Sequence, residues 1–307
     1  MAILVVGSVA LDDIQSPYGK VRASLGGSAT FFALSASYFT QVRMIAVVGD
    51  DFGKQHEDVF RKQGIDITGI EHAAGKTFHW SGEYGENPND CKMHDLQMNV
   101  FEKFQPKIPT GYGDSEYVFL GNINPELQSE VRKQMRGAKF VGLDTHPFWI
   151  ETTPQQLAQA IGDIDIMIIN DGEARQFAKD NNLLRSANKI LALGPKALVI
   201  KHGEYGATIF FQKGAYGFGG HPFRAPALPL DEVRDPTGAG DAFAGGFLGY
   251  IASQGKITAD VLKRAMFYGG VMGGFAVERF GTERLLSLTR QEIDSRFQLF
   301  REMTHLE

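Results

Sequence analysis

Short runs of consecutive apolar residues recur along the chain, and helix-compatible stretches separate most of them. The runs are continuous rather than alternating, which is typical of strands covered on both faces in a parallel sheet. Several of the intervening stretches end at glycine, a common helix terminator. The pattern therefore predicts an α/β fold with a mainly parallel central sheet. The predicted strands are 3–7, 44–49, 117–122, 140–144, 166–170 and 198–201, and the predicted helices are 50–64, 125–137, 154–162 and 186–193.

Most of the predicted strands end in a polar residue or glycine. In open parallel sheets ligands bind beyond the carboxyl ends of the strands, so these end residues are predicted to line one edge of the sheet. The first apolar run, in the N-terminal segment MAILVVGSVALDD, stops at Asp12 within strand length, and we interpret it as a strand rather than a leader peptide. The polar residues expected at the edge are Asp12, Asn122, Asp144, Asn170 and Lys201.

Length and composition limit the possible functions. The 307 residues, of which 43% are apolar, suffice for one large α/β domain, and we predict a single domain over 1–307. The net charge of −5 provides no basic stripe for a phosphate backbone, which argues against nucleic acid polymers as partners. The longest later apolar run, 265–277, is shorter than the about 20 residues that span a bilayer, so no membrane segment is predicted.

The cysteine content indicates a compartment. Cys91 is the only cysteine, which excludes an intrachain disulfide. This agrees with a reducing environment, and we predict a cytoplasmic protein. Cys91 and His94 lie close together in the sequence, where a metal pair is conceivable. Solvated loop residues are the more common interpretation, and we assign the two residues no role.

The segment 76–104 departs from the continuous apolar pattern. Phe78, Trp80 and Tyr84 alternate with polar residues, 96–100 alternates likewise, and GENPND between them is typical of a turn. This predicts a β-hairpin with one apolar face, inserted into the α/β frame. Three interpretations stay open: a flap over the active edge, a subunit contact, or an antiparallel extension of the main sheet.

Some familiar motifs are absent or incomplete. Gly75-Lys76-Thr77 looks like the end of a phosphate-binding loop, but Gly69 lies one residue too far upstream, and the residues that follow alternate like a strand. The dinucleotide-binding G-x-G-x-x-G, the zinc-binding H-E-x-x-H and the nucleophile elbow G-x-S-x-G do not occur. A dinucleotide-dependent oxidoreductase, which shares the strand and helix rhythm, is therefore disfavoured.

The segment DPTGAGDAFAGGF, residues 235–247, places a carboxylate between a run of small residues and an apolar helix. The first amides of a helix lack internal partners and favour negative charge, so the turn at 238–240 can hold a phosphate. Either Asp241 or Thr237 caps the helix, or Asp241 is a base beside a phosphoryl group that the amides stabilise. A cap does not need the Gly-Ala-Gly run as well, which favours the base.

DPTGAGDAFAGGF is similar to the signature of the ribokinase-type, or PfkB-type, carbohydrate kinases. Other matches follow in family order along nearly the whole chain. They are GSVALDD (7–13), LGGSATFFALSAS (25–37), VVGDDFG (47–53), NDGE (170–173) and KHGEYGA (201–207). The resemblance implies a three-layer α/β sandwich with a small β lid, contributed by about 13–25 and 76–104. Such a lid excludes water from the reaction.

The resemblance also implies roles for individual residues. Asp241 takes the proton from the attacking hydroxyl, and the amides of Gly238, Ala239 and Gly240 form an anion hole for the γ-phosphoryl group of ATP. Phosphoryl transfer depends mainly on such positioning and charge neutralisation. The residues implied at ATP and Mg²⁺ are Asn170, Glu173, Lys201, Gly203, Gly206 and Thr237, with Glu173 reaching the metal through water. Those implied at the acceptor are Asp12, Gly26, Gly27, Ser28 and Phe31. A monovalent cation is a further cofactor to be tested.

Each of these residues could also serve an ordinary structural purpose. Asn170 and Glu173 can be a strand end and an exposed first-turn acid, Lys201 can be a solvated strand end, and the di-glycine can be only a turn before a helix. Asp12 is the strongest acceptor residue, because a carboxylate after an apolar strand lies on the binding edge. Asp13 beside it is the alternative.

Departures from the family pattern bear on the acceptor. Family sugar kinases often carry asparagine after the di-glycine, where this chain has Phe31, or Thr30 if the alignment slips by one. Ribokinase has asparagine two residues before its aspartate, where this chain has Ala10, and both changes disfavour D-ribose. Phe31 and the aromatic lid face are instead suited to stack on a nucleobase. We expect a nucleoside kinase. The alternatives are a kinase for a sugar or cyclitol and a nucleotide-binding protein without turnover, and a homodimer through the lid is also open.

Overall fold

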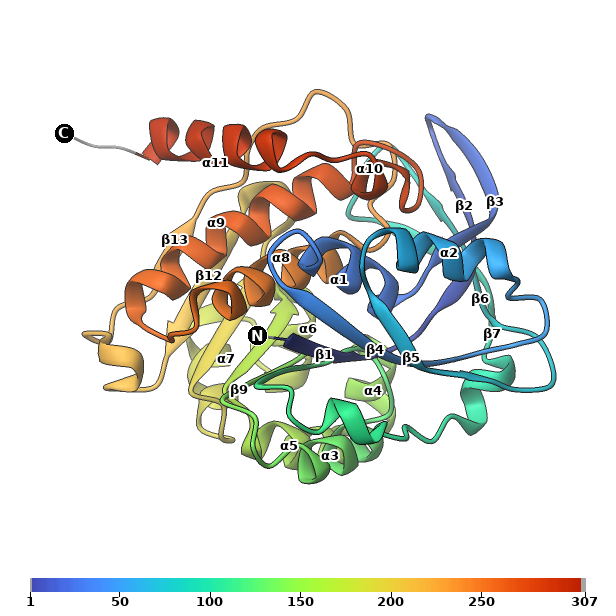
Figure 1. Ribbon diagram of the computed structural model, residues 1–307. Helices are drawn as coiled ribbons and strands as arrows, with labels where there is room; N and C mark the ends of the chain where they lie inside the picture. Colours follow the sequence, from blue (N-terminus) through green and yellow to red (C-terminus); the bar gives the residue numbers. More distant parts are fainter. Residues whose placement is uncertain (1, 305–307) are drawn as a thin grey trace.

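A nine-stranded sheet forms the centre of the computed structural model, which describes residues 2–304 (Figure 1). All neighbouring strands from β11 to β5 run parallel, and β12 and β13 add an antiparallel edge. The prediction of a mainly parallel central sheet is therefore confirmed. In sheet order the strands are β13 (Phe223–Ala225), β12 (Ala207–Phe211), β11 (Ala197–Lys201), β10 (Ile166–Asn170), β9 (Phe140–Leu143), β8 (Tyr117–Leu120), β1 (Ala2–Val6), β4 (Gln41–Val48) and β5 (Asp66–His72).

Helices cover both faces of this sheet and complete a three-layer sandwich (Figure 1). On one face α8 packs between α1 and α9, and α11 lies against α9. The opposite face carries α3, α5, α6 and α7. The helices are α1 (Ser28–Ala36), α2 (Lys54–Lys62), α3 (Pro125–Gln134), α4 (Pro147–Thr152), α5 (Pro154–Ala160), α6 (Asp171–Ala178), α7 (Leu183–Leu191), α8 (Ala239–Gln254), α9 (Ala259–Ala276), α10 (Glu283–Leu286) and α11 (Arg290–Thr304).

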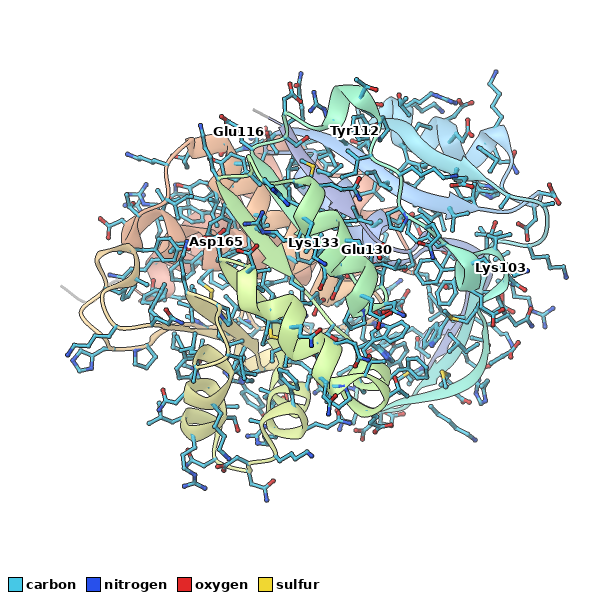
Figure 2. All side chains as sticks on the ribbon, turned by 90° about the horizontal axis from the view of Figure 1, so that it is seen from below. Lys103, Tyr112, Glu116, Glu130, Lys133 and Asp165 are labelled. Atoms are coloured by element: carbon cyan, nitrogen blue, oxygen red, sulfur yellow. The ribbon has the colours of Figure 1, made fainter. Side chains whose placement is uncertain are left out.

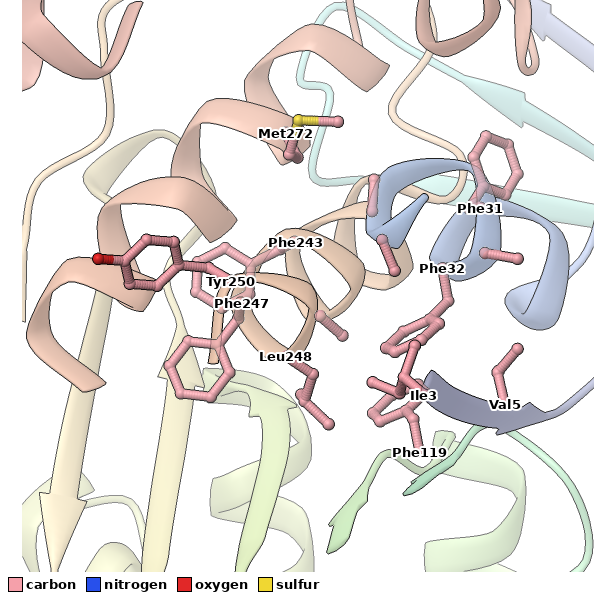
Figure 3. Close-up of a cluster of buried hydrophobic side chains, with 14 of the residues drawn as sticks. Ile3, Val5, Phe31, Phe32, Phe119, Phe243, Phe247, Leu248, Tyr250 and Met272 are labelled. Atoms are coloured by element: carbon pink, nitrogen blue, oxygen red, sulfur yellow. The ribbon is translucent and has the colours of Figure 1, made fainter. Parts of the chain in front are cut away.

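Neighbouring residues of β1 enter two separate cores. Ile3 belongs to the core under α1, α8 and α9, whereas Leu4 belongs to the core under α3, α5 and α7. A strand that buries both faces needs consecutive apolar residues, which is why the runs in the sequence do not alternate. In the first core Phe32 stacks on Phe119 with ring centroids 4.3 Å apart, close to Ile3 (Figure 3).

Glycines let α8 approach its neighbours backbone to backbone. A Cβ on Gly245 would lie 2.4 Å from the carbonyl oxygen of Phe32 in α1, and one on Gly246 would lie 2.7 Å from that of Tyr268 in α9. Both distances are too short for any side chain at these positions. The contacts with α1 and α9 fix the position of α8 on this face of the sheet. They thereby also fix the position of the turn that precedes α8.

Several elements fall outside the predicted ones: α9, α11, β5, β12 and β13. Helix α9 lies between α8 and α11 and is apolar on most of its surface, so its sequence lacks the one-sided period that identifies an exposed helix. Despite this composition, no helix within residues 2–304 is long and apolar enough to cross a membrane.

A second sheet of four strands lies beside the main one, in the order β3-β2-β6-β7 (Figure 1). Its strands are β2 (Ala10–Ser16), β3 (Gly19–Gly26), β6 (Phe78–Tyr84) and β7 (Cys91–Gln97), and we call it the small sheet. β6 and β7 form the predicted hairpin, and they do not extend the main sheet. β7 begins earlier than expected, so Cys91 and His94 lie in a strand rather than in a turn, and 99–103 form a 3₁₀ helix.

The structure corrects the expected place of Asp12. We predict this residue at the end of the first strand, but β1 ends at Val6 and a turn leads into β2, which contains Asp12. The carboxylate thus belongs to the small sheet and not to the edge of the main sheet. The break between the two strands covers residues 7–9.

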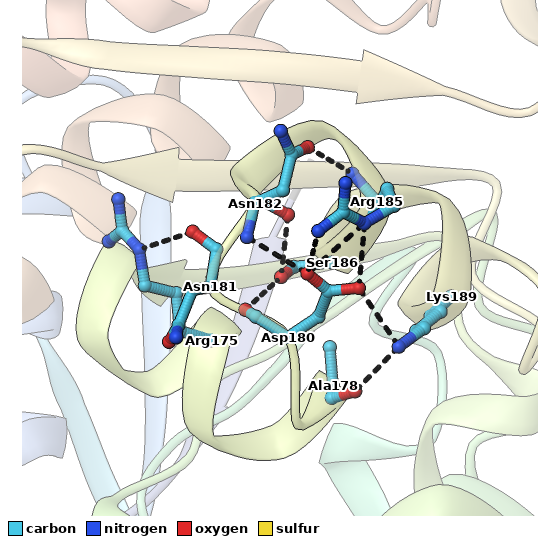
Figure 4. A network of polar contacts seen from close by, with 8 residues as sticks. All are labelled: Arg175, Ala178, Asp180, Asn181, Asn182, Arg185, Ser186 and Lys189. Atoms are coloured by element: carbon cyan, nitrogen blue, oxygen red, sulfur yellow. Dashed lines mark hydrogen bonds and ion pairs between the residues drawn. The ribbon is translucent and has the colours of Figure 1, made fainter.

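Charged side chains occupy the outer surface of the helices, as Figure 2 shows for Glu130 and Lys133 of α3. At the connection of α6 and α7, the carboxylate of Asp180 accepts hydrogen bonds from Arg185 and pairs with Lys189 at 3.1 Å (Figure 4). These cations hold the pKa of Asp180 well below its usual range. The network ties the end of α6 to α7, on the side of α6 away from the sheet edge.

Candidate active site

A tight turn at 237–240 begins α8 at the carboxyl edge of the sheet. Gly238 takes a left-handed conformation with φ of 72°, and no side chain caps the helix, so neither Asp241 nor Thr237 acts as the cap. Asp235 stabilises the turn. Its carboxylate accepts hydrogen bonds from the amide of Thr237 at 2.9 Å and from the amide of Gly281 at 2.7 Å. The side chain of Asp235 is fully buried.

The amides of this turn are only partly free. Within residues 2–304, those of Gly238 and Gly240 donate to no backbone or side-chain acceptor, whereas that of Ala239 donates to the carbonyl of Pro236 at 3.2 Å. Two of the three amides implied for an anion hole are therefore available as the turn stands. The amide of Ala239 can contribute to an anion hole only if it shares or breaks its hydrogen bond to the carbonyl of Pro236.

Three carboxylates and one ammonium group meet beside this turn. Lys201 ends β11, its Nζ lies 3.8 Å from a carboxylate oxygen of Asp144, and a Cβ on Gly240 would lie 2.6 Å from the same Nζ. Burial raises the pKa of Asp241 to about 7, and Asp144 and Glu173 add to this effect while Lys201 opposes it. Burial likewise raises the pKa of Glu173 to about 7. One cation is thus shared among three acids.

Lys201 stays charged in this environment. Burial by itself would lower the pKa of the amine, but Asp144, Glu173 and Asp241 raise it above its usual value. The sequence predicts Asp144 only as an edge residue, and it has no role among those implied by the family resemblance. Its signal in the sequence is its position directly after a buried strand, comparable to that of Lys201 at the end of β11.

Asn170 and Glu173 form a capping box at the start of α6. The Asn170 side chain accepts the amide of Glu173 at 2.8 Å, and the Glu173 carboxylate accepts the amide of Asn170 at the same distance. The pair therefore has a structural role, but Glu173 is buried and is not the exposed acid expected, and its second oxygen is left for a ligand. Among the described residues no three carboxylates, histidines or cysteines are close enough to enclose a metal ion.

This arrangement fits Mg²⁺ held through water and phosphate. Mg²⁺ usually keeps several waters and takes one or two protein carboxylates together with the phosphates of its substrate. Burial first, and the neighbouring carboxylates next, raise the pKa of Glu173 and Asp241, and a divalent cation beside them would stabilise their charged forms. Glu173 is the carboxylate with an oxygen to spare.

Asp12 reaches the site from the small sheet. One of its carboxylate oxygens has no partner within the described residues, and the other lies where a Cβ on Gly26 would be, at 1.9 Å. Burial first, and Asp235 next, raise the pKa of Asp12 to about 8, although the backbone amide of Trp80 lowers it. Asp13 instead accepts the amide of Ala23 at 2.8 Å. Asp12 is thus the buried, unsatisfied member of the pair.

The di-glycine turn shows why glycines are needed here. Gly27 has φ of 93°, and a Cβ on it would lie 2.5 Å from the carbonyl oxygen of Ser8. The hydroxyl of Ser28 accepts the amide of Ser8 at 3.1 Å, and that of Ser8 accepts the amide of Ser28 at 3.0 Å. In this structure Ser28 therefore supports the turn that carries Gly26.

Phe31 does not occupy the place that we predict for it. Its side chain is 1% exposed, and a Cβ on Gly238 would lie 2.2 Å from its ring. The ring lies beneath the turn at 237–240 and has no open face on which a nucleobase could stack. The expectation of a stacking Phe31 is wrong for this conformation, because burial of a large ring in the core outweighs exposure to a polar cleft.

A pocket of about 460 Å³ opens on the other side of the turn. Lys201, Gly203, Gly206 and Gly240, which the family resemblance implies at the nucleotide, all line it. Gly206 cannot carry a side chain, since a Cβ would lie 2.1 Å from the carbonyl oxygen of Ala225. The apolar wall of the pocket is not among the features predicted from the sequence. This wall includes Ala225, Leu228, Phe243, Met266, Gly270, Gly273 and Val277.

The profile of the pfkB family carbohydrate kinases matches residues 3–287. The chain belongs to the pfkB family of carbohydrate kinases. This kinase is a phosphotransferase that acts on a hydroxyl group. It is 31% identical over 263 residues to the cytidine kinase of Thermococcus kodakarensis, covering 83% of this chain and 89% of that protein. It is 28% identical over 295 residues to the 5-dehydro-2-deoxygluconokinase of Clostridium perfringens, covering 85% and 83%.

The fold of the kinase is that of solved members of the family. The nucleoside kinase of Methanocaldococcus jannaschii superposes with a TM-score of 0.77 at 19% identity, covering 97% of this chain and 98% of that one. At such low identity the likeness concerns the fold alone. It confirms the three-layer α/β arrangement expected from the family resemblance.

The contact of Gly238 with Phe31 predicts a defined loss of stability. Gly238→Ala should lower the free energy of unfolding by roughly 1–3 kcal/mol more than Gly64→Ala, because overpacking adds to the shared cost of a positive φ. Gly64 has φ of 69° and open space where a Cβ would lie, so it measures the backbone cost alone. Urea unfolding gives both values. Phe31→Leu should recover part of the loss in the Gly238→Ala background, and equal losses at the two glycines would contradict the contact.

The raised pKa of Asp12 predicts how stability depends on pH. The folded ligand-free kinase holds the Asp12 proton up to about pH 8, whereas the unfolded chain loses it near the usual value of 3.8. The unfolded state therefore binds fewer protons between these values, and this residue makes stability fall as pH rises through that window. At pH 9 the free energy of unfolding of Asp12→Asn should exceed that of wild type by about 1–3 kcal/mol. Near pH 4 the two proteins should be equally stable.

Asp13→Asn is the matched control, because it removes the neighbouring charge and leaves the buried one. Chemical denaturation of the three proteins across pH 4–9 gives the comparison. If Asp12→Asn and wild type lost stability in parallel as the pH rises, the buried and unsatisfied state of Asp12 would be refuted.

Proposed function

We propose that this kinase transfers the γ-phosphoryl group of ATP to the 5′-hydroxyl of a ribonucleoside. The observation that carries the proposal is the turn at 237–240, where free amides adjoin Asp241. Residues 239–240 of the turn line the 460 Å³ pocket, and the buried Asp12 is near enough to Asp241 for their charges to interact. Its relative from T. kodakarensis, named cytidine kinase, supports a nucleoside as the acceptor.

Asp241 is the proposed base. With a pKa of about 7 the carboxylate can accept a proton near neutral pH, which is where a general base works best. The amides of Gly238 and Gly240, and Ala239 once its turn bond opens, stabilise the charge on the transferring group. Lys201 neutralises further charge and, with Gly203 and Gly206, binds the phosphate side of ATP.

Asn170 and Glu173 are the proposed residues for Mg²⁺. Glu173 holds a water ligand of the metal with its spare oxygen, and Asn170 fixes the carboxylate through the capping box. The metal supplies charge neutralisation at the phosphates of ATP. Thr237 is proposed near the same phosphates, at the start of the turn.

Asp12 is the proposed ligand of the acceptor. Its unpartnered oxygen can accept a hydrogen bond from a ribose diol, and this bond replaces the missing solvation of the carboxylate. Gly26 leaves the space that the carboxylate of Asp12 occupies, and Gly27 permits the turn beside it. Since Phe31 offers no stacking face, any base contact comes from other residues.

A free sugar or cyclitol is the second candidate acceptor. Burial of Phe31 removes one argument for a nucleobase, and a relative of comparable coverage is named 5-dehydro-2-deoxygluconokinase. Such an acceptor would use Asp12 in the same way. A nucleotide-binding protein without turnover is disfavoured, because binding alone does not require the carboxylate of Asp241.

Three expectations from the sequence stay predictions. A homodimer through the small sheet is supported by the exposed strand β7, in which Met93 is 56% and Leu96 is 41% exposed. A requirement for a monovalent cation and a cytoplasmic location rest on the family resemblance and on composition.

A substrate panel tests the choice of acceptor. We expect the kinase to phosphorylate at least one ribonucleoside, with cytidine the first to try, faster than ribose, fructose or a cyclitol. Coupled measurement of ADP formation, with mass spectrometry of the products, gives the ranking. Faster turnover of a free sugar would refute the nucleoside proposal and leave the kinase itself intact.

Replacement of the base tests the mechanism. Asp241→Asn should keep ATP binding and lower phosphoryl transfer by roughly 10²–10⁴-fold, the usual worth of a positioned base. Single-turnover kinetics with the best acceptor, together with calorimetric ATP binding, separates the two properties. Asp260→Asn, in the first turn of α9, is the control for loss of a helix-terminal acid. Near-native transfer by Asp241→Asn would refute its role as base.

A further inference from the structure

The β6–β7 hairpin contacts both sides of the proposed site. Strand β6 lies on the acceptor side, where Trp80 pairs with Asp12 in the register between β6 and β2. The turn at 85–90 lies on the nucleotide side, where Pro88 and Asn89 line the 460 Å³ pocket. The hairpin therefore spans the distance between the two halves of the site.

The turn of the hairpin rests on a nucleotide-side loop of the main domain. A Cβ on Gly203 would lie 2.6 Å from the side-chain oxygen of Asn89, so the two residues are in close contact. Gly203 begins the short 3₁₀ turn after β11, directly beyond Lys201. Pro88 and Asn89 thus form part of the pocket wall. Among the described residues, none from the four strands of the small sheet lines this pocket.

Tyr84 anchors the hairpin to the turn that begins α8. It is the last residue of β6, and its hydroxyl forms a hydrogen bond of 3.1 Å with the hydroxyl of Thr237. The amide of Thr237 is itself held by the buried Asp235. Burial raises the pKa of the Tyr84 phenol, so it stays neutral and keeps its proton. Hairpin, phosphate-binding turn and buried core are linked through this pair.

We propose that the β6–β7 hairpin is a nucleotide-binding element, in which Pro88 and Asn89 contact bound ATP and Tyr84 holds them in place through Thr237. The inference rests on the proposed nucleotide site and adds to it a wall contributed by the small sheet. Tyr84 is a positioning residue. On this proposal ATP contacts the hairpin even when no acceptor is present.

Nucleotide affinity tests this proposal without any acceptor. We expect Tyr84→Phe and Asn89→Ala to raise the Kd of Mg²⁺ with a non-hydrolysable ATP analogue by about 3–10-fold, the worth of one neutral hydrogen bond or contact. Tyr18→Phe is the matched control. Tyr18 lies in the β2–β3 turn of the same sheet, is 48% exposed, and its hydroxyl has no hydrogen-bond partner within residues 2–304. Isothermal titration calorimetry gives the three values against wild type.

Hydrogen exchange gives a second measurement that does not depend on a variant. Amides of 84–91 in the wild-type kinase should exchange more slowly once the ATP analogue is added alone. If Tyr84 had a purely structural role, Tyr84→Phe would lower the thermal stability of the ligand-free kinase. The Kd of the ATP analogue and the protection of 84–91 by the analogue would then be the same in this variant as in wild type.

The outcomes separate this inference from the proposed function. Binding of the analogue with an unaltered Kd in Tyr84→Phe and Asn89→Ala, and no protection of 84–91, would overturn the role of the hairpin alone. Protection of the hairpin in a protein that phosphorylates no member of the panel would support the hairpin and refute the function. If wild type did not bind the ATP analogue, both the role of the hairpin and the proposed function would be refuted.

Discussion

The arrangement of the site depends on one buried ammonium group that faces three carboxylates. Lys201 comes from β11, Asp144 follows β9, Glu173 lies in α6 and Asp241 in α8, so four elements have to meet for the charges to balance. The balance is incomplete, because one cation faces three acids, and burial together with this crowding raises the pKa of Glu173 and Asp241. A site of this kind is prepared for a ligand that brings positive charge with it, and the protein holds the deficit through a core that is already closed on both faces of the sheet.

Much of the fold could be predicted from the sequence because parallel strands buried on both faces leave continuous apolar runs. The turn at 238–240 and Asp241 could be predicted too, since glycines followed by an acid and an apolar helix are typical of an anion-binding helix start. The place of Asp12 could not, because a three-residue break between β1 and β2 looks like part of one strand. Phe31 shows the second limit: whether an aromatic residue faces a cleft or the core is decided by a neighbour, Gly238, that is far away in the sequence.

Several residues carry structural and proposed chemical roles together. Asn170 and Glu173 cap α6 and also present an oxygen to the site, and Ser28 closes the turn that makes room for Asp12 beside Gly26. A substitution at such a position changes stability and ligand binding at once. Effects on stability and on ligand binding can be separated only at residues where one of them is absent. Asp13 serves this purpose beside the buried Asp12, and Tyr18 serves it beside the anchored Tyr84.

The glycines of α8 imply a division between parts that move and parts that do not. Contacts made from backbone to backbone have no rotamers to change, so α8 has little freedom to tilt or slide between α1 and α9. Motion that accompanies ligand exchange must then be taken up by the segment before the helix and by the hairpin that rests on it. The helix serves as a fixed reference against which those segments are positioned, and its small residues are a mechanical requirement as much as a packing one.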